Sequence, residues 1–224
     1  MERAYRNLGF VLLALPLIFI MGFWIPYISQ IPHLDPAITP AVHVHALLLF
    51  AWVALLVAQP LAIRSSAFTV HRLLGKASYV LMPLILLFAI GMVHKEYLQH
   101  LANGTNAVTA RTAEYLSSCQ LVMLAGFYVL AVSRIQKGNT ADHMRYMICI
   151  ALVLLPAGLA RTLGYWFNVS QTLSQTVCLA VIDLCLVALI IFDKRWRISA
   201  QPYTIALAAY LTVEAGWVAL GRPV

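Results

Sequence analysis

Seven long apolar runs constrain the fold of this chain more than any other feature. Each holds about 20 residues, which is the length a helix needs to cross the roughly 30 Å hydrocarbon core of a bilayer. The runs cover residues 8–28, 42–63, 73–94, 114–134, 144–166, 172–192 and 202–220. Polar turn signals separate them, and the longest expected loop is 95–113. The sequence therefore predicts an all-α integral membrane bundle of seven transmembrane helices, forming a single domain over residues 1–224.

Composition agrees with a lipid-exposed surface. Hydrophobic residues make up 62% of the chain and charged residues 10%, whereas soluble domains carry about 25% charged residues. The net charge of +7 does not indicate a nucleic-acid partner, because the basic residues are scattered beside the apolar runs. We interpret the first run as a retained helix, since Pro26-Tyr27 is not a small-residue cleavage site. All four cysteines lie in apolar runs, and we expect buried free thiols.

The distribution of arginine and lysine predicts the orientation. Cytoplasmic loops carry an excess of these residues. Four basic residues fall on one side of the expected helices, namely Lys95, Arg111, Arg161 and Arg222. Eleven fall on the other: Arg3, Arg6, Arg64, Arg72, Lys76, Arg134, Lys137, Arg145, Lys194, Arg195 and Arg197. We therefore expect a multi-pass protein of the bacterial cytoplasmic (inner) membrane, with its N-terminus in the cytoplasm and its C-terminus outside.

A few polar residues lie where lipid would not tolerate them. Ionisable groups inside a span usually face the bundle interior and often mark function. The group consists of His45, Arg161, Asp183 and Glu214. One interpretation is a buried ion pair of Arg161 with Asp183 or Glu214. Another is a polar cavity that is open to the outside and binds a substrate or cofactor. The two are compatible, and the sequence leaves both open.

One face of the second expected helix is marked by a polar stripe. His45, Trp52 and Gln59 are spaced by seven residues and so share a face. His43 lies about 200° around the helix from His45. We therefore expect His45 to point inward and His43 to point toward the membrane interface.

Histidines near the helix ends suggest cofactor chemistry. Two histidines at matched depth on different helices can ligate haem iron from both faces, or hold a transition metal. His71 and His143 form such a pair, and Arg72 and Arg145 beside them would contact haem propionates. A further outer pair is His45 with His94. His71 and His94 are about 34 Å apart along one helix. Because that separation exceeds the usual spacing of stacked haems, interfacial histidines without a cofactor are the alternative interpretation.

Two stretches also carry a family resemblance. The first is His71-Arg72-Leu73-Leu74-Gly75-Lys76, and the second runs from Arg134 to Met147 and includes Asp142-His143-Met144-Arg145-Tyr146-Met147. They resemble the HRxLGR and AHRRWM-type signatures of a widespread group of bacterial multi-pass membrane proteins of unknown function, with departures at Met144 and Tyr146. The resemblance covers residues 43–163 and also includes His45 and Arg161. It implies an architecture and a residue set but no reaction. A looser analogy links the helix-end histidines to haem-b membrane reductases.

Three functions remain open from the sequence. The first is a redox or electron-transfer protein, an oxidoreductase or its subunit, which binds haem b or a transition metal and exchanges electrons with a quinone. The second is a non-catalytic accessory subunit that packs against other membrane subunits. The third is a proton-coupled small-molecule transporter that uses Asp183 and Glu214, because intramembrane carboxylates serve proton relays.

Overall fold

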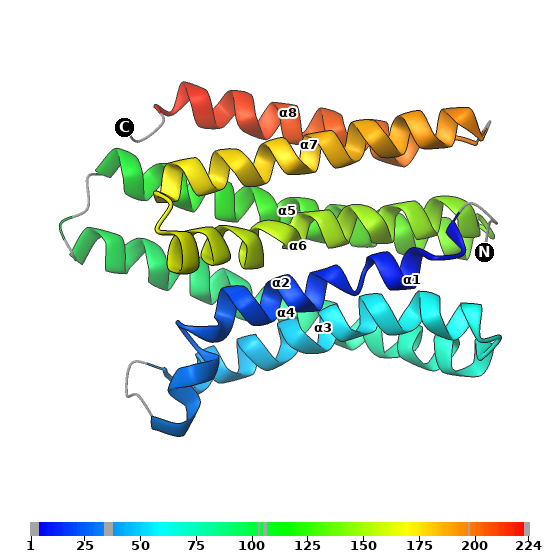
Figure 1. Cartoon of the computed structure of the whole chain (residues 1–224), viewed down its shortest axis with the longest axis horizontal. Coiled ribbons are helices and arrows are strands. Elements are labelled where there is room, and N and C mark those ends of the chain that lie inside the picture. The colour runs from blue at the N-terminus through cyan, green and yellow to red at the C-terminus, as the bar shows by residue number, and fades with distance from the viewer. Residues whose placement is uncertain (1–4, 34–37, 103, 105–106, 197, 222–224) are drawn as a thin grey trace.

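The computed structural model describes residues 5–33, 38–102, 104, 107–196 and 198–221, and these residues form a helical bundle (Figure 1). Over this part of the chain the regular structure is helical, with no strand. The helices are α1 Leu8–Val11, α2 Ala14–Trp24, the 3₁₀ helix η2 Ile28–His33, α3 Pro40–Arg64, α4 Phe68–Ala102, α5 Ala107–Gln136, α6 Thr140–Phe167, α7 Gln171–Arg195 and α8 Gln201–Ala219.

The long helices run alternately up and down, so the bundle has two distinct ends. One end carries the start of α1 and the α3–α4, α5–α6 and α7–α8 connections, at the right of Figure 1, and we call it the N-side end. The C-side end carries the end of α8 and the α4–α5 and α6–α7 connections. Helix α6 packs against α2, α5, α7 and α8. It is the central helix, and residues on several of its faces are buried.

Five helices, α3 to α7, are long and apolar enough to cross a membrane. The segment Leu8–Trp24 is shorter, and α8 is not among the five. Large apolar side chains cover the outside of the bundle. Leu47, Val122 and Leu184 each expose 70% or more of their surface. Lipid contact explains this surface, because water would not tolerate so many exposed apolar side chains. The apolar helices are those of an integral membrane protein.

The first expected span is interrupted rather than continuous. Helix α1 ends at Val11, and α2 begins at Ala14. Pro16 is the physical cause, because its ring clashes with the carbonyl four residues earlier and it has no N–H to donate. The chain tightens at this point, and the Leu15 N–H bonds to the Leu12 carbonyl at 3.1 Å. The prediction of one helix over 8–28 is therefore wrong in its continuity.

The expected long loop over 95–113 is also wrong. Helix α4 continues to Ala102, and α5 begins at Ala107. The sequence after residue 94 is rich in helix-forming residues such as Lys, Glu, Leu and Gln. Glu96 and His100 lie one turn apart, with Oε1 and Nε2 separated by 4.0 Å. These two helices therefore extend beyond the apolar runs from which the spans were predicted.

A glycine contact brings α2 and α6 together. A Cβ atom added to Gly22 would overlap the backbone carbonyl of Gly158. The two helices can approach this closely only because neither residue has a side chain. Nearer the C-side end, the Trp166 Nε1–H donates to the Met21 carbonyl at 2.9 Å. These contacts fix the position of α2 on α6 in the C-side half of the bundle.

Candidate functional site

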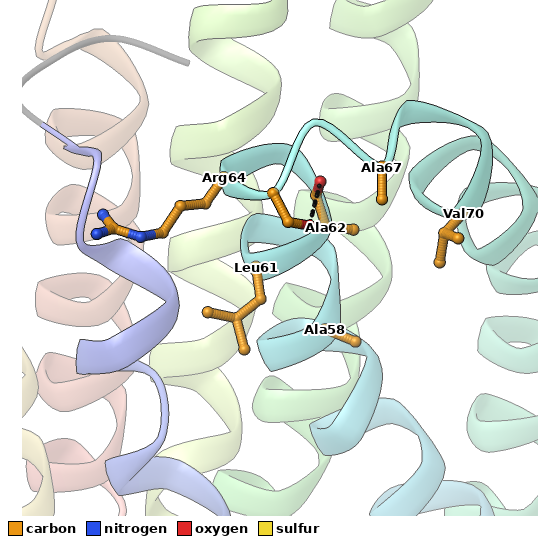
Figure 2. A pocket seen from close by; sticks show the side chains of 7 residues that line it. Ala58, Leu61, Ala62, Arg64, Ala67 and Val70 are labelled. Atoms are coloured by element: carbon orange, nitrogen blue, oxygen red, sulfur yellow. Dashed lines mark hydrogen bonds between the residues drawn. The ribbon is translucent and has the colours of Figure 1, made fainter.

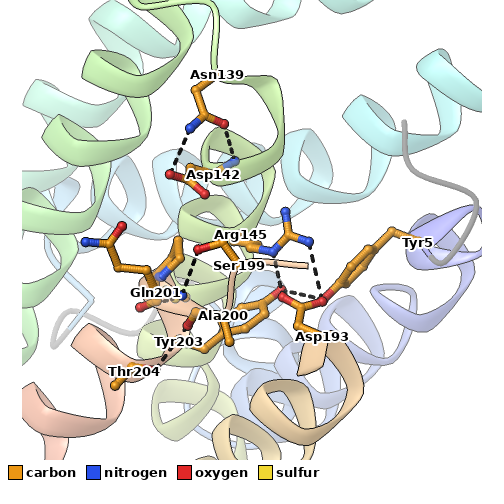
Figure 3. A network of polar contacts seen from close by, with 12 residues as sticks. Tyr5, Asn139, Asp142, Arg145, Asp193, Ser199, Ala200, Gln201, Tyr203 and Thr204 are labelled. Atoms are coloured by element: carbon orange, nitrogen blue, oxygen red, sulfur yellow. Dashed lines mark hydrogen bonds and ion pairs between the residues drawn. The ribbon is translucent and has the colours of Figure 1, made fainter. Parts of the chain in front are cut away.

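A fully buried polar network joins four distant parts of the chain at the N-side end (Figure 3). The Arg145 Nε–H donates to Asp193 Oδ2 at 2.6 Å, and the Tyr5 hydroxyl donates to Asp193 Oδ1 at 2.6 Å. The Tyr203 hydroxyl in turn donates to the Tyr5 oxygen at 3.2 Å. Arg145, Asp193 and Tyr203 are completely buried. The network therefore connects the N-terminal segment to α6, α7 and α8.

This network changes the role expected for Arg145. The sequence placed Arg145 beside His143 as a contact for haem propionates, whereas the structure commits it to Asp193. The Arg145 guanidinium also lies 5.3 Å from the centre of the Tyr5 ring. Burial, together with the hydrogen bond to Asp193, raises the pKa of the Tyr5 hydroxyl above its ordinary value. Both effects favour the neutral phenol, so Tyr5 acts as a donor to the carboxylate.

His71 on α4 and His143 on α6 both lie in the N-side half of the bundle. They interact electrostatically across α4 and α6. The His143 Nδ1–H donates to the Ala131 carbonyl at 2.9 Å, so Nε2 is the ring nitrogen that this hydrogen bond does not use. The Nδ1 atom of His71 is buried without a hydrogen-bond partner, and so is the Oε1 atom of Gln59. The Gln59 side chain reaches α4 one turn after His71. Its Nε2 atom lies 3.7 Å from the point where a Cβ on Gly75 would be.

These residues set limits on what the histidine group could hold. Within the described part of the chain, no three His, Cys, Asp or Glu side chains lie close enough to bind a metal ion together. A bare transition metal usually takes three or four protein ligands. Haem iron needs only two, because the porphyrin supplies the other four. A haem would therefore need no more than two histidines from this chain, whereas a bare metal ion would need further ligands. Among the described contacts, none joins His45 to His94, the second histidine pair that the sequence suggested. Arg72, which was expected beside His71, is exposed.

A carboxyl pair lies in the middle of the bundle between α7 and α8. Asp183 and Glu214 interact through their side chains. Asp183 is twelve residues from either end of α7, about 18 Å in each direction. Its Oδ1 atom is buried without another partner. Tyr210, one turn before Glu214 on α8, is 1% exposed, and its hydroxyl is buried without a partner. Tyr210 and Asp183 are close enough to interact electrostatically.

The predicted ion pair of Arg161 with Asp183 is not formed, because the Asp183 side chain interacts with that of Glu214. Among the described contacts, Arg161 Nη1 donates to the Ala157 carbonyl at 2.8 Å. Its guanidinium carbon lies 4.9 Å from the centre of the Phe23 ring. Arg161 also acts electrostatically on His45. Helix α6 directs Arg161 toward α2 and α3, which places it on another side of the bundle from α8.

The stripe predicted on α3 lies in the interior. One polar atom of each of His45, Trp52 and Gln59 is buried without a hydrogen-bond partner. Trp52 is completely buried, and its ring meets that of Tyr128 edge to face at 5.7 Å. His43, in contrast, is exposed and bonds to the Tyr27 hydroxyl at 2.9 Å. The expected inward direction of His45 and outward direction of His43 agree with this arrangement.

A shallow apolar depression lies beside the α3–α4 turn (Figure 2). Arg64 at its edge reaches toward the N-terminal segment and donates to the Arg6 carbonyl at 3.1 Å and to Asn7 Oδ1 at 2.8 Å. The Ser65 hydroxyl donates to the Ala62 carbonyl at 3.2 Å. The polar groups of these two residues are therefore already engaged. We assign the depression no chemistry, and its apolar lining suits lipid. It is lined by Ala58, Leu61, Ala62, Arg64, Ser65, Ala67 and Val70.

Sequence reasoning missed Tyr5, Asp193, Tyr203 and Tyr210. Asp193 lies just beyond the apolar run 172–192, and hydropathy alone does not indicate that its carboxylate is buried. The only signal for the network was an acid and a basic residue, Asp193 and Arg145, at the same end of neighbouring helices. Tyr210 carried a signal too, since it lies one helical turn from Glu214.

No protein-family model matches the chain, and neither a curated protein nor a solved structure matches it. The resemblance to the bacterial multi-pass group over residues 43–163 therefore stays a prediction, and the function has to be argued from the geometry.

Proposed function

We propose that this protein translocates protons across the bacterial cytoplasmic membrane. In this proposal α1–α2 and α3 to α8 cross the bilayer seven times, with the N-side end in the cytoplasm and the C-terminus outside. The observation that carries the proposal is the interaction of Asp183 with Glu214 at mid-depth. Two carboxyl groups that share a hydrogen bond must hold at least one proton between them, because two carboxylates would repel and neither could donate.

A row of buried hydroxyls on α8 supports a route to this pair. Tyr203, Tyr210 and Glu214 are spaced by seven and four residues, so they share one face of the helix. Tyr203 joins the N-side network through Tyr5, and Tyr210 lies near Asp183. A hydroxyl can accept one proton and donate another. The row therefore places one hydroxyl at the N-side end and another near the carboxyl pair. About 10 Å along the helix separates Tyr203 from Tyr210, so protons would need bridging water between them.

The roles of the residues follow from this arrangement. The Asp183–Glu214 pair takes up a proton from one side and releases it to the other. Tyr210, which has no hydrogen-bond partner in the described part of the structure and lies close enough to Asp183 to interact electrostatically, would donate its hydroxyl hydrogen once the pair ionises. Apolar packing around α7 and α8 keeps water from bypassing the pair, because Ile182 and Leu186 beside Asp183 are completely buried.

Reconstituted liposomes test the proposal. The purified protein is placed in vesicles that contain a pH-sensitive dye, and a potassium diffusion potential drives protons inward. We expect acidification with the wild type and at least about a tenfold slower rate with Asp183→Asn or Glu214→Gln, since a carboxamide cannot release a proton. Glu96→Gln is the matched control, because this carboxylate lies at the C-side end on α4. Wild-type vesicles no faster than protein-free vesicles would refute the proposal, and so would equal rates in all variants.

A second candidate is a haem-binding redox protein with quinone as its electron partner. The specific observation in its favour is the pair of imidazoles in which His143 Nδ1 is committed to the Ala131 carbonyl. Such a hydrogen bond orients a ligating histidine and leaves Nε2 for iron. His71 would supply the opposite ligand. A bound haem would add one-electron chemistry, whereas this chain would contribute ligation and an apolar surrounding.

An absorption spectrum of the purified protein, before and after reduction, decides this second candidate. A Soret band that disappears in His71→Ala and in His143→Ala, but persists in His94→Ala, would support it. A wild-type sample with no Soret band, prepared from haem-supplemented cells, would exclude it. Neither result affects the liposome test of the carboxyl pair.

A further inference from the structure

Arg161 is an arginine inside a span for which the described helices supply no counter-ion. The guanidinium contacts the Ala157 carbonyl and the face of the Phe23 ring. Helices α2, α3 and α6, which surround it, carry one carboxylate between them, Asp142. That carboxylate lies near the start of α6, about 28 Å away along the helix. Charged groups inside membranes are normally paired, whereas the three helices around this guanidinium leave it without an anion.

The direction of the side chain excludes simple snorkelling. Arg161 lies six residues before the end of α6, about 9 Å from the C-side end. An arginine at this depth usually extends toward the nearer interface, where water solvates its charge. Here Nη1 bonds to the carbonyl of Ala157, which is one turn farther from that interface. The guanidinium is therefore held back toward the membrane interior.

His45 provides a second polar group at the same place. It lies five residues into α3, about 8 Å from the C-side end, and therefore at nearly the depth of Arg161. The two residues are close enough to interact electrostatically. The His45 Nδ1 atom is buried without a hydrogen-bond partner. The guanidinium of Arg161 has N–H donors and no acceptor. An Nδ1–H of His45 therefore cannot donate to it and needs another group as its acceptor.

Packing fixes the geometry of these groups. The Gly22–Gly158 contact and the Trp166–Met21 hydrogen bond hold α2 on α6, and the two α6 residues in these contacts lie on either side of Arg161 along the helix. The Phe23 ring stacks on Phe19 with centroids 5.6 Å apart, so it forms a fixed apolar wall under the guanidinium. Arg161 itself is exposed and therefore accessible.

We infer that Arg161 and His45 form an anion-binding site at the C-side end, between α2, α3 and α6, for a carboxylate or phosphate group. The planar guanidinium presents paired N–H donors that match two oxygens of such a group. His45 Nδ1 donates a further hydrogen bond in its Nδ1–H form. Phe23 accommodates an apolar part attached to the anion. The same chemistry occurs in an anionic lipid headgroup and in a small soluble anion. This inference goes beyond proton translocation and does not depend on it.

Thermal unfolding of the delipidated protein in a neutral detergent tests the site. The probes are inorganic phosphate, hexanoate and phosphatidylglycerol, with phosphatidylcholine as the zwitterionic control. At about a hundredfold excess over the dissociation constant, we expect a binding probe to raise the wild-type midpoint by about 5–10 °C. Arg161→Gln should weaken binding by at least about tenfold, because it removes charge-assisted hydrogen bonds. Arg111→Gln, which changes an exposed arginine at the same end, should bind like the wild type.

The outcomes separate the sources of the anion. A shift with phosphate or hexanoate that is lost in Arg161→Gln identifies a soluble anion, whereas a shift with phosphatidylglycerol alone identifies a lipid headgroup. If Arg161→Gln does not fold, Arg161→Lys serves instead, and its weaker binding measures the loss of the planar fork. The inference is overturned if no probe raises the wild-type midpoint, or if every protein shifts equally. No proton gradient is present, so failure here is distinct from failure of proton translocation.

Discussion

Asp193 offers the sharpest test of the structure, because three donor atoms converge on its buried carboxylate. It accepts hydrogen bonds from Arg145 Nε at 2.6 Å, from Tyr5 at 2.6 Å and from Arg145 Nη2 at 3.4 Å. The substitution Asp193→Asn keeps the shape of the side chain and removes its charge. The Arg145 guanidinium then remains completely buried without its counter-ion. Breaking a buried pair in this way costs about 3–5 kcal/mol.

Further variants show how much of the lost free energy of unfolding comes from each hydrogen bond and from the buried charge. Tyr5→Phe removes one hydrogen bond to a charged acceptor and should cost about 1.5–3 kcal/mol. Replacing both charged residues, as in Arg145→Met with Asp193→Leu, removes the desolvation cost together with the attraction. We expect this double variant to be more stable than Asp193→Asn alone. Glu96→Gln is the control, since exposed pairs contribute about 0–1 kcal/mol.

Reversible unfolding in mixed micelles, followed by circular dichroism, gives these free energies. The reasoning would be refuted if Asp193→Asn lost no more stability than Glu96→Gln. It would also be refuted if the double variant were less stable than both of its single substitutions, because the pair would then contribute more than its burial costs.

Two further predictions concern the glycine contact and alkaline pH. Gly22→Ala should cost about 1–3 kcal/mol, because the new methyl group overlaps the Gly158 carbonyl. Gly126→Ala, which has open space at its Cβ, should be neutral or stabilising in the same unfolding assay. Burial raises the pKa of Tyr5, so above about pH 10 the unfolded chain releases this proton before the folded protein does, and stability falls as the pH rises. Tyr5→Phe should flatten that fall in a pH series of unfolding measurements, and an unchanged slope would contradict the burial of Tyr5.

The sequence was sufficient for features that depend on one helix at a time. Apolar runs located the helices, and the spacing of His45, Trp52 and Gln59 identified an interior face of α3. The termini of the helices were less accessible, because the residues after position 94 are polar yet favour a helix. Hydropathy measures lipid compatibility and not helix length.

Contacts between helices could not be read in the same way. Arg161, Asp183 and Glu214 were recognised as costly residues, but their pairing depends on the rotation of three helices about their axes. Arg145 was predicted to lie on the cytoplasmic side as a contact for haem propionates, since an arginine near a helix end looks the same in the sequence whether it faces water or Asp193. Only the packing of α6 against α7 distinguishes these cases.

The link between Arg145 and Asp193 also has a consequence for biosynthesis. The two residues are 48 positions apart, and Tyr5 is 188 positions from Asp193. Ribosomes add about 5–20 residues per second, so Arg145 leaves the ribosome about 2–10 s before its counter-ion. During that interval Arg145 lacks the Asp193 carboxylate, and its positive charge favours retention of the start of α6 at the membrane surface. Helix α6 therefore reaches its final packed position only after α7 has been synthesised. The N-terminal segment, which binds Asp193 through Tyr5, attaches at the same stage.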